Sequence, residues 1–186
     1  KVTPPLLNAA PELRDRVLAV NGVSKTYAMT GWRIGWMAGP SDVIGALNTL
    51  VSQSAGNACS ISQAAAVEAL NGSQSFVTES AEIYRSRRDQ TLARVNKITG
   101  LSCTPPDGAF YLYVNCAGLI GRTTPAGTRI QTDSDVAMYL LERVGVAVVQ
   151  GSAYGLSPYF RMSIAASQDV LDEGTDRIAR AVSELR

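Results

Sequence analysis

The chain has 186 residues, of which 46% are hydrophobic, and its 17 basic and 16 acidic residues leave a formal net charge of +1. This size allows one globular domain or two small ones, and the balanced charge excludes binding of nucleic acid or of an acidic membrane by charge alone, so we expect neither partner. The sequence contains no histidine, which removes the commonest metal ligand and the usual base of a serine or cysteine hydrolase, so we expect no metal site.

The cysteines and the first residues bear on where the protein resides. Cys59, Cys103 and Cys116 are odd in number and have no CxxC spacing, which is typical of reduced thiols, so we expect a cytoplasmic location. Residues 1–16 lack the apolar core of a signal peptide, and no later run approaches the roughly 20 apolar residues of a membrane span, so we expect a soluble protein. Because the sequence opens at Lys1 without an initiator Met, we also expect a piece of a longer protein.

The first elements in chain order are two expected strands. Short apolar runs over residues 17–21 and 32–38 end at Asn-Gly and at Gly-Pro, respectively. Turn residues of this kind commonly stand at the ends of strands. We therefore predict two strands separated by a loop that contains Lys25.

Two helices are expected next. Ser41 and Asp42 supply an N-cap and an acidic first turn for a helix that ends before Gly56. The apolar residues of this segment share one face by their spacing; they are Val43, Ile44, Leu47, Leu50 and Val51. An Ala-rich helix over residues 62–70 closes at Asn-Gly, a good C-terminal stop.

A longer helical pattern runs from about residue 73 to residue 99 and ends at Gly100. It carries many charges, which predicts a solvated helix linking two bodies; the charged residues are Glu79, Glu82, Arg85, Arg87, Arg88, Asp89 and Arg94. The expected division is therefore residues 1–72, a connecting helix over 73–99, and a smaller α/β domain over 100–186.

The last part of the chain predicts three strands and two helices. An alternating strand over 109–115 follows a Pro-Pro-Asp-Gly turn, and a Gly/Thr/Pro loop follows it. A helix over 133–144 and strands over 146–149 and 159–163 come next. A final helix is expected from one stripe at spacings of three and four; its residues are Leu171, Gly174, Ile178, Val182 and Leu185.

The chain has three lysines, and Lys25 is the one that lies where a strand ends and a cavity could open; the others are Lys1 and Lys97. A lysine amine partly removed from water is a good nucleophile toward a carbonyl. Arg33 lies eight residues later between two glycines, where a guanidinium could bind an anion in bidentate fashion. The spacing alone favours a surface lysine and a salt-bridged strand arginine, because single residues of these types are mostly structural surface residues.

Residues 21–40, NGVSKTYAMTGWRIGWMAGP, resemble the pyridoxal-phosphate lysine segment of the class I aminotransferases, the fold type I group that includes aspartate aminotransferases. The match is nearly continuous over about 20 residues, which makes it specific. The resemblance implies that Lys25 bonds covalently to pyridoxal 5'-phosphate and that Arg33 binds the phosphate. Gly22 stands where some relatives have a phosphate-binding serine, and Ser24 is expected to substitute for it weakly.

Two further segments are similar to this family. Arg161, in the stretch Tyr-Phe-Arg-Met-Ser over 159–163, matches the late strand whose arginine binds the substrate α-carboxylate, a task that suits a planar guanidinium. Without the resemblance, Arg161 would be interpreted as a strand arginine paired with an acid. Gly-Ala-Phe-Tyr-Leu over 108–112 is similar to a segment that lines the substrate pocket.

The resemblance implies the C-terminal part of the large cofactor-binding domain followed by the small α/β domain of fold type I. Amino acid and 2-oxo acid substrates, and a homodimer of the longer protein, are implied as well. The family's earlier half has no counterpart in residues 1–186, including the aspartate that pairs with the ring nitrogen. We therefore expect little or no activity from these 186 residues alone. No Lys or Arg lies between residues 34 and 84, so nothing here fixes aspartate as the preferred substrate.

Two alternatives remain open from the sequence. A β-lyase or a cyclopropane-forming synthase of the same fold would share the lysine and both arginines. A transcription regulator with an aminotransferase-like effector module would carry a basic winged-helix segment before residue 1.

Overall fold

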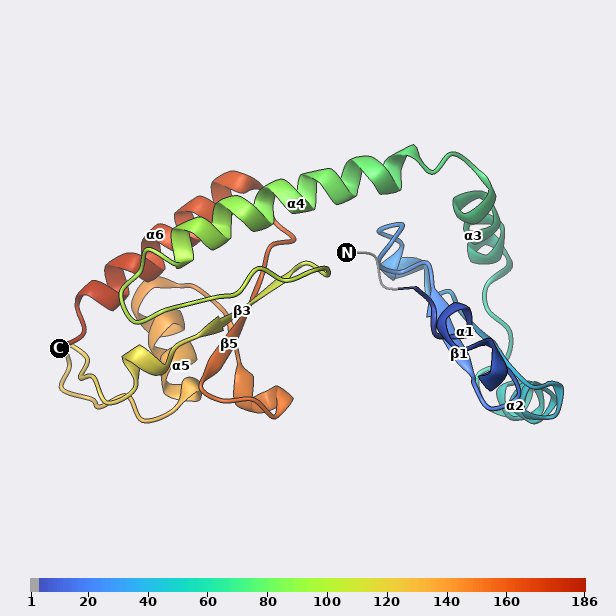
Figure 1. Ribbon diagram of the computed structural model, residues 1–186, viewed down its shortest axis with the longest axis horizontal. Coiled ribbons are helices and arrows are strands. Elements are labelled where there is room, and N and C mark those ends of the chain that lie inside the picture. Colours follow the sequence, from blue (N-terminus) through green and yellow to red (C-terminus); the bar gives the residue numbers. More distant parts are fainter. Residues whose placement is uncertain (1–3) are drawn as a thin grey trace. The chain divides into compact units, whose positions relative to one another are not determined.

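The computed structural model describes residues 4–186, and the chain divides into two compact units, Lys1–Ser80 and Ala81–Arg186 (Figure 1). The boundary falls inside the long helix α4 (Ser75–Val95). The expected connecting segment is therefore divided between the two units. Lys1 and its two neighbours lie outside the described residues.

The first unit contains a two-stranded antiparallel sheet. Strand β1 (Ala19–Gly22) pairs with β2 (Gly35–Ala38), and Gly22 lies opposite Gly35. Both predicted strands are present, but β2 begins three residues later than predicted. The reason is local: residues 30–32 form the short 3-10 helix η2 (Thr30–Trp32), and Arg33 then takes a left-handed conformation with φ 56°.

Four helical segments complete the first unit. Helix α1 (Leu6–Ala9) and the 3-10 turn η1 (Pro11–Leu13) precede the sheet, and α2 (Ser41–Ser54) and α3 (Ser60–Asn71) follow it. The two later helices were predicted, and α3 is longer than predicted. The expected Ser41 N-cap is wrong, because Pro40 occupies that position and no side chain caps the helix.

Very little of the first unit is buried. Within residues 4–80 the buried residues are Val23, Ser62 and Ala66, whereas Val20, Leu50 and Ile61 are 62–71% exposed. A two-stranded hairpin is at best marginally stable in water unless a third strand or a packed helix supports it. These residues therefore lack a hydrophobic core of their own.

The second unit is built on a three-stranded antiparallel sheet. The strand order is β3 (Tyr111–Asn115), β5 (Tyr159–Ser163), β4 (Val149–Gln150), so β5 is central. The prediction for β5 is confirmed, and β3 starts two residues later than predicted because Ala109 has a positive φ of 62°. The predicted strand over 146–149 is mostly wrong, since the Val146 N–H donates to the Leu140 carbonyl and ends the preceding helix.

Two helices frame this sheet. Helix α5 (Asp133–Val144) matches its prediction and begins with a capping box, in which Thr132 and Asp135 satisfy each other's backbone N–H groups. Helix α6 (Gln168–Ser183) carries the predicted buried stripe, except that Gly174 is half-buried and the neighbouring Thr175 takes the core position. Both helices contribute to one core.

The core of the second unit lies on one face of the sheet. Along β3 and β5 burial alternates, so that Leu112, Val114, Phe160 and Met162 join α4, α5 and α6 in a single cluster. The opposite face carries tyrosines and Arg161, which are half-buried. The sheet thus has a structural face and a polar aromatic face.

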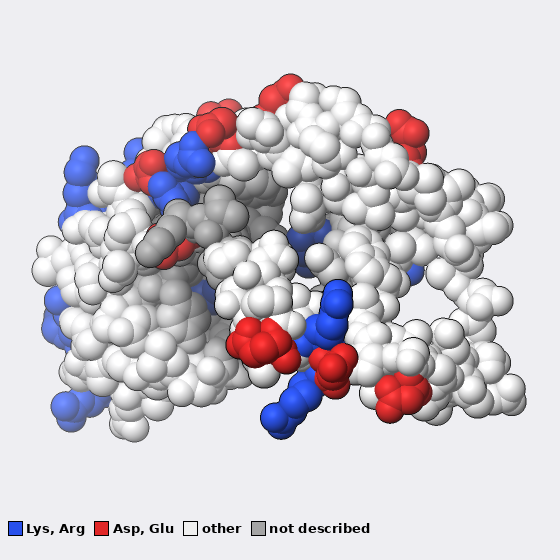
Figure 2. All heavy atoms as spheres, turned by 45° about the vertical axis from the view of Figure 1, so that its right-hand side comes forward, with Lys and Arg blue, Asp and Glu red and all other residues white. Residues whose placement is uncertain are grey.

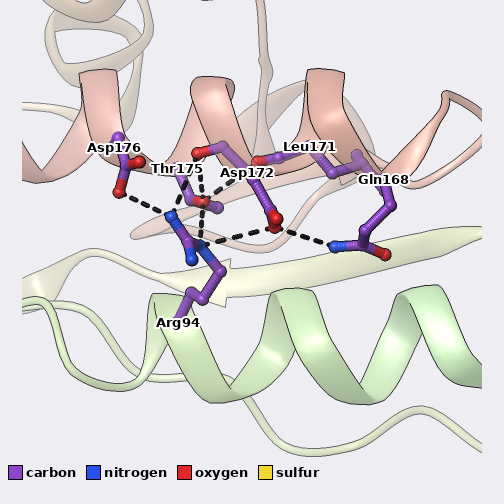
Figure 3. Close-up of polar contacts among 6 residues, drawn as sticks. All are labelled: Arg94, Gln168, Leu171, Asp172, Thr175 and Asp176. Carbon is purple, nitrogen blue, oxygen red and sulfur yellow. Dashed lines mark hydrogen bonds and ion pairs between the residues drawn. The ribbon is translucent and has the colours of Figure 1, made fainter.

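The C-terminal turns of α4 pack against α6, which corrects the expectation of a fully solvated helix. Thr91 and Val95 are completely buried, and Arg94 connects the two helices (Figure 3). The Arg94 Nε donates to Thr175 Oγ1 at 2.9 Å, and its Nη2 donates to Asp176 Oδ1 at 2.6 Å. Asp172 completes the cluster, with an oxygen 3.6 Å from Nε.

We expect Arg94→Met to lower the free energy of unfolding by about 1–2 kcal/mol, because the substitution removes several charge-assisted hydrogen bonds and leaves the nearly buried Thr175 with one donor fewer. Arg94→Lys should recover only part of this, since an ammonium cannot contact Thr175 and Asp176 in the same fork geometry. Thermal or urea unfolding of the chain would measure both. Arg177→Met, which removes the exposed ion pair between Arg177 and Glu173, serves as a control expected to change the free energy of unfolding by less than about 0.5 kcal/mol. An equal loss of stability in Arg94→Met and Arg177→Met would contradict the role of the cluster.

The charged residues do not form a patch of one sign on the face in Figure 2, where acidic and basic side chains are interspersed among uncharged surface. Among the described helices, none is both long enough and apolar enough to cross a membrane.

Candidate active site

Lys25 lies on a turn that directly follows β1. Val23, completely buried, anchors the start of this turn, and its carbonyl accepts from the Tyr27 N–H at 3.2 Å. The Thr30 hydroxyl donates to the Ser24 carbonyl at 3.1 Å. The Tyr27 hydroxyl donates to Gln74 Oε1 at 2.9 Å, which ties the turn to the segment before α4. The backbone around Lys25 is therefore held at both ends.

One concave pocket brings three of the sequence-predicted site residues together. Its volume is about 440 Å³, and its walls include Ser24, Lys25 and Arg33. The remaining lining residues come from the ends of β1 and β2 and from Thr26. An amine, a guanidinium and two hydroxyls thus line one space.

Gly22 cannot be replaced by a larger residue without movement. A Cβ at this position would lie 2.9 Å from the Ile34 carbonyl oxygen, across the β1–β2 pair. A serine here would therefore require the two strands to shift apart. The close pairing explains why this chain has glycine, and it leaves Ser24 and Thr26 as the hydroxyl groups of the pocket.

Arg33 adopts a left-handed backbone conformation, which non-glycine residues rarely take and which commonly marks functional positions. Its Nη1 donates to the Thr30 carbonyl at 3.0 Å. Within residues 4–80 no carboxylate forms an ion pair with it, so the interpretation as a salt-bridged strand arginine is wrong.

Lys25 is exposed, whereas the sequence argument expected an amine partly removed from water. The reason is the sparse packing of the first unit, in which Val23 is the one buried residue of this turn. The residues of the described chain therefore position the amine without sheltering it.

The donor set of the pocket fits pyridoxal phosphate. A primary amine can bond to an aldehyde, and a guanidinium with neighbouring hydroxyls can bind a phosphate. These groups come from four residues that line the pocket, Lys25, Arg33, Ser24 and Thr26. They are the residues that would hold the cofactor in this chain.

Arg161 belongs to the second unit and lies on the polar aromatic face of its sheet. Its guanidinium carbon is 4.2 Å from the centre of the Tyr111 ring and 4.5 Å from that of Tyr154. No carboxylate of residues 81–186 forms an ion pair with it, so the interpretation as a strand arginine paired with an acid is wrong. Its N–H groups are available for a carboxylate from outside the unit.

Sequence reasoning missed Tyr154 and Asp133. Tyr154 ends the 3-10 turn η4 (Gly151–Tyr154), and nothing in its local sequence indicates contact with Arg161. Asp133 is 1% exposed and accepts from the Ser152 N–H at 2.9 Å. Burial alone would raise the pKa of Asp133, but hydrogen bonds from Ser152, Ser157 and Tyr159 outweigh it and lower the pKa below that of an ordinary aspartate. The carboxylate is therefore charged inside the fold.

The family model of aminotransferase class I and II matches residues 2–178. The chain belongs to this family. An aspartate aminotransferase of Rhizobium meliloti (strain 1021) is 52% identical over 184 residues, which are 99% of this chain and 44% of that protein. An aspartate/prephenate aminotransferase of Cereibacter sphaeroides is 50% identical over 168 residues, 90% of this chain and 42% of that protein.

The solved structures agree with the aminotransferase assignment. The crystal structure of the aspartate aminotransferase from Rhizobium meliloti superposes with a TM-score of 0.95 at 50% identity, over 98% of this chain and 46% of that one. An aspartate aminotransferase from Thermus thermophilus gives a TM-score of 0.80 at 36% identity. The expected fold, a part of a fold type I aminotransferase, is confirmed, and the chain spans less than half the length of the relatives it matches.

Proposed function

We propose that this chain is the later part of a pyridoxal-phosphate aminotransferase that moves an amino group between an amino acid and a 2-oxo acid. The observation that carries the proposal is the pocket shared by Lys25 and Arg33 in a chain of the aminotransferase family. The names of its relatives support aspartate as the amino donor.

Each of the three charged residues has a separate task in this proposal. The Lys25 amine would hold the cofactor through its aldehyde and would serve as the base that takes the proton from the substrate Cα. Arg33, with Ser24, holds the phosphate by charge-assisted hydrogen bonds. Arg161 binds the α-carboxylate through its planar fork of N–H donors. When bound, pyridoxal phosphate supplies the aldehyde that takes up the amino group and a ring that accepts the electron pair from Cα.

The finer properties expected from the sequence are also part of the proposal. A homodimer of the longer protein is supported by the exposed apolar residues of the first unit, because such surface is commonly covered by another polypeptide. A cytoplasmic location is supported by the three free cysteines, two of which are buried.

A product assay tests the function. A longer polypeptide that carries this chain, incubated with aspartate, 2-oxoglutarate and pyridoxal phosphate, is expected to form glutamate and oxaloacetate in equal amounts. Prephenate should be tested as a second amino acceptor, since the Cereibacter relative is named for it. Formation of ammonia or pyruvate without glutamate would show that the protein is a lyase of the same fold and not an aminotransferase. Absence of both glutamate and oxaloacetate would refute the proposal.

A further inference from the structure

The two tyrosines against Arg161 are held in place by different means. Tyr111 is fixed by the sheet, because β3 and β5 are hydrogen bonded and Tyr111 lies opposite Ser163. Tyr154 comes from the loop between β4 and β5, where no ladder fixes its position. What orders this loop therefore decides whether the second ring contacts the guanidinium.

Asp133 holds the loop between β4 and β5 by hydrogen bonds on both sides of Tyr154. Its carboxylate, almost completely buried, accepts from the backbone N–H of Ser152 at 2.9 Å and from that of Tyr159 at 3.5 Å. These two donors lie on either side of Tyr154 in the chain. The carboxylate has no ion-pair partner within residues 81–186, so its charge is compensated by these N–H groups, by serine hydroxyls and by the start of α5.

A second contact restricts the same loop. The Tyr113 hydroxyl donates to the Gly151 carbonyl at 3.1 Å. At Gly151 a Cβ would lie 2.2 Å from the Leu156 carbonyl oxygen, so the backbone at the start of the loop packs directly against that of Leu156. The loop over 151–158 is therefore held in one conformation, and Tyr154 is presented to Arg161.

We propose that Asp133 and Tyr154 are positioning residues for Arg161: Asp133 fixes the loop, and the Tyr154 ring holds the guanidinium in the orientation that receives a substrate carboxylate. An arginine side chain loses several rotatable bonds on binding, and contact of its flat face with an aromatic ring restricts them beforehand while leaving the N–H edge open. The inference rests on the proposed role of Arg161 and adds to it two residues that act through it.

A pair of substitutions at one position separates this role from simple packing. Tyr154→Leu removes the ring face, whereas Tyr154→Phe keeps it and removes only the hydroxyl. In the longer polypeptide we expect Tyr154→Leu to raise KM for aspartate and for 2-oxoglutarate roughly fivefold or more, with a smaller change in kcat. The KM values of Tyr154→Phe should stay within about twofold of those of the unsubstituted protein. The absorbance of the bound cofactor should be the same in all three.

A double substitution tests the link to Asp133. Asp133→Asn removes the charge at nearly constant volume, and it should raise KM in the same direction as Tyr154→Leu. In the Tyr154→Leu background it should add almost nothing, because the ring through which it acts is absent. Effects on KM that multiply would overturn the assignment of Asp133, and equal KM values for the Leu and Phe variants would overturn that of Tyr154.

Binding of succinate, measured by calorimetry, makes the test independent of turnover. Succinate should bind more weakly to Tyr154→Leu and far more weakly to Arg161→Leu, while Tyr154→Phe should bind it like the unsubstituted protein. If the polypeptide lacks aminotransferase activity but shows this order, the proposed function fails and the inference stands. If it is active but all variants bind succinate equally, the function stands and the inference is wrong.

Discussion

Replacing Lys25 by alanine in a longer polypeptide that carries this chain is expected to abolish covalent attachment of the cofactor and to lower kcat by about 10²–10⁴-fold or more. The reason is that one amine is assigned both the bond to the aldehyde and the removal of the Cα proton. Two measurements check this: glutamate formation from aspartate and 2-oxoglutarate, and the visible absorbance of the bound cofactor.

Lys97→Ala is a matched control, since Lys97 is an exposed lysine and is not among the residues that line the pocket of Lys25. Its activity should equal that of the unsubstituted protein. Retention of both absorbance and turnover in Lys25→Ala would end the assignment of this lysine, whereas an equal loss in both variants would point to misfolding.

The two parts of the chain are expected to differ sharply in their ability to fold when each is expressed by itself. Residues 75–186, which keep α4 whole, should fold cooperatively, because they contain a cluster of 19 buried hydrophobic residues over three helices and a sheet. Residues 1–74 should remain largely unfolded, because Val23 and Ala66 are the buried hydrophobic residues among the described part of this segment.

Circular dichroism and amide proton dispersion would measure the difference. The larger piece should melt in one sigmoidal transition and show dispersed resonances, and the smaller piece should do neither. A cooperative transition in residues 1–74 would show that the exposed apolar side chains of α2 and α3 pack in a way that the present fold does not contain.

The strongest periodic signals in the sequence predicted the structure most accurately. Helix α5 has a capping box at its start and a glycine in left-handed conformation after its end, and strand β5 alternates between buried residues and half-buried or exposed ones. Such local signals are complete within a few residues of sequence. The predictions failed at the start of β2 and at residues 146–148, where a left-handed Arg33 and a helix-ending hydrogen bond replace the expected strand backbone.

The residues of the candidate sites also fall into those that the sequence indicated and those that it did not. Lys25 and Arg33 line one pocket, and the motif shows both of them because only seven residues of turn and short helix separate them in the chain. Tyr154 and Asp133 could not be found, because Tyr154 contacts Arg161, and Asp133 contacts the loop that carries Tyr154, only after segments distant in sequence come together. Their positions depend on tertiary contacts and leave no spacing to detect.

The left-handed backbone of Arg33 also bears on any attempt to make this protein more heat-resistant. Three non-glycine residues of the described chain have positive φ, and all of them, Ala28, Arg33 and Ala109, lie within segments shared with the family. Glycine would relax each position by about 1 kcal/mol. A screen that rewards melting temperature alone should therefore select Arg33→Gly, and the more stable protein would lack the guanidinium that we propose binds the phosphate.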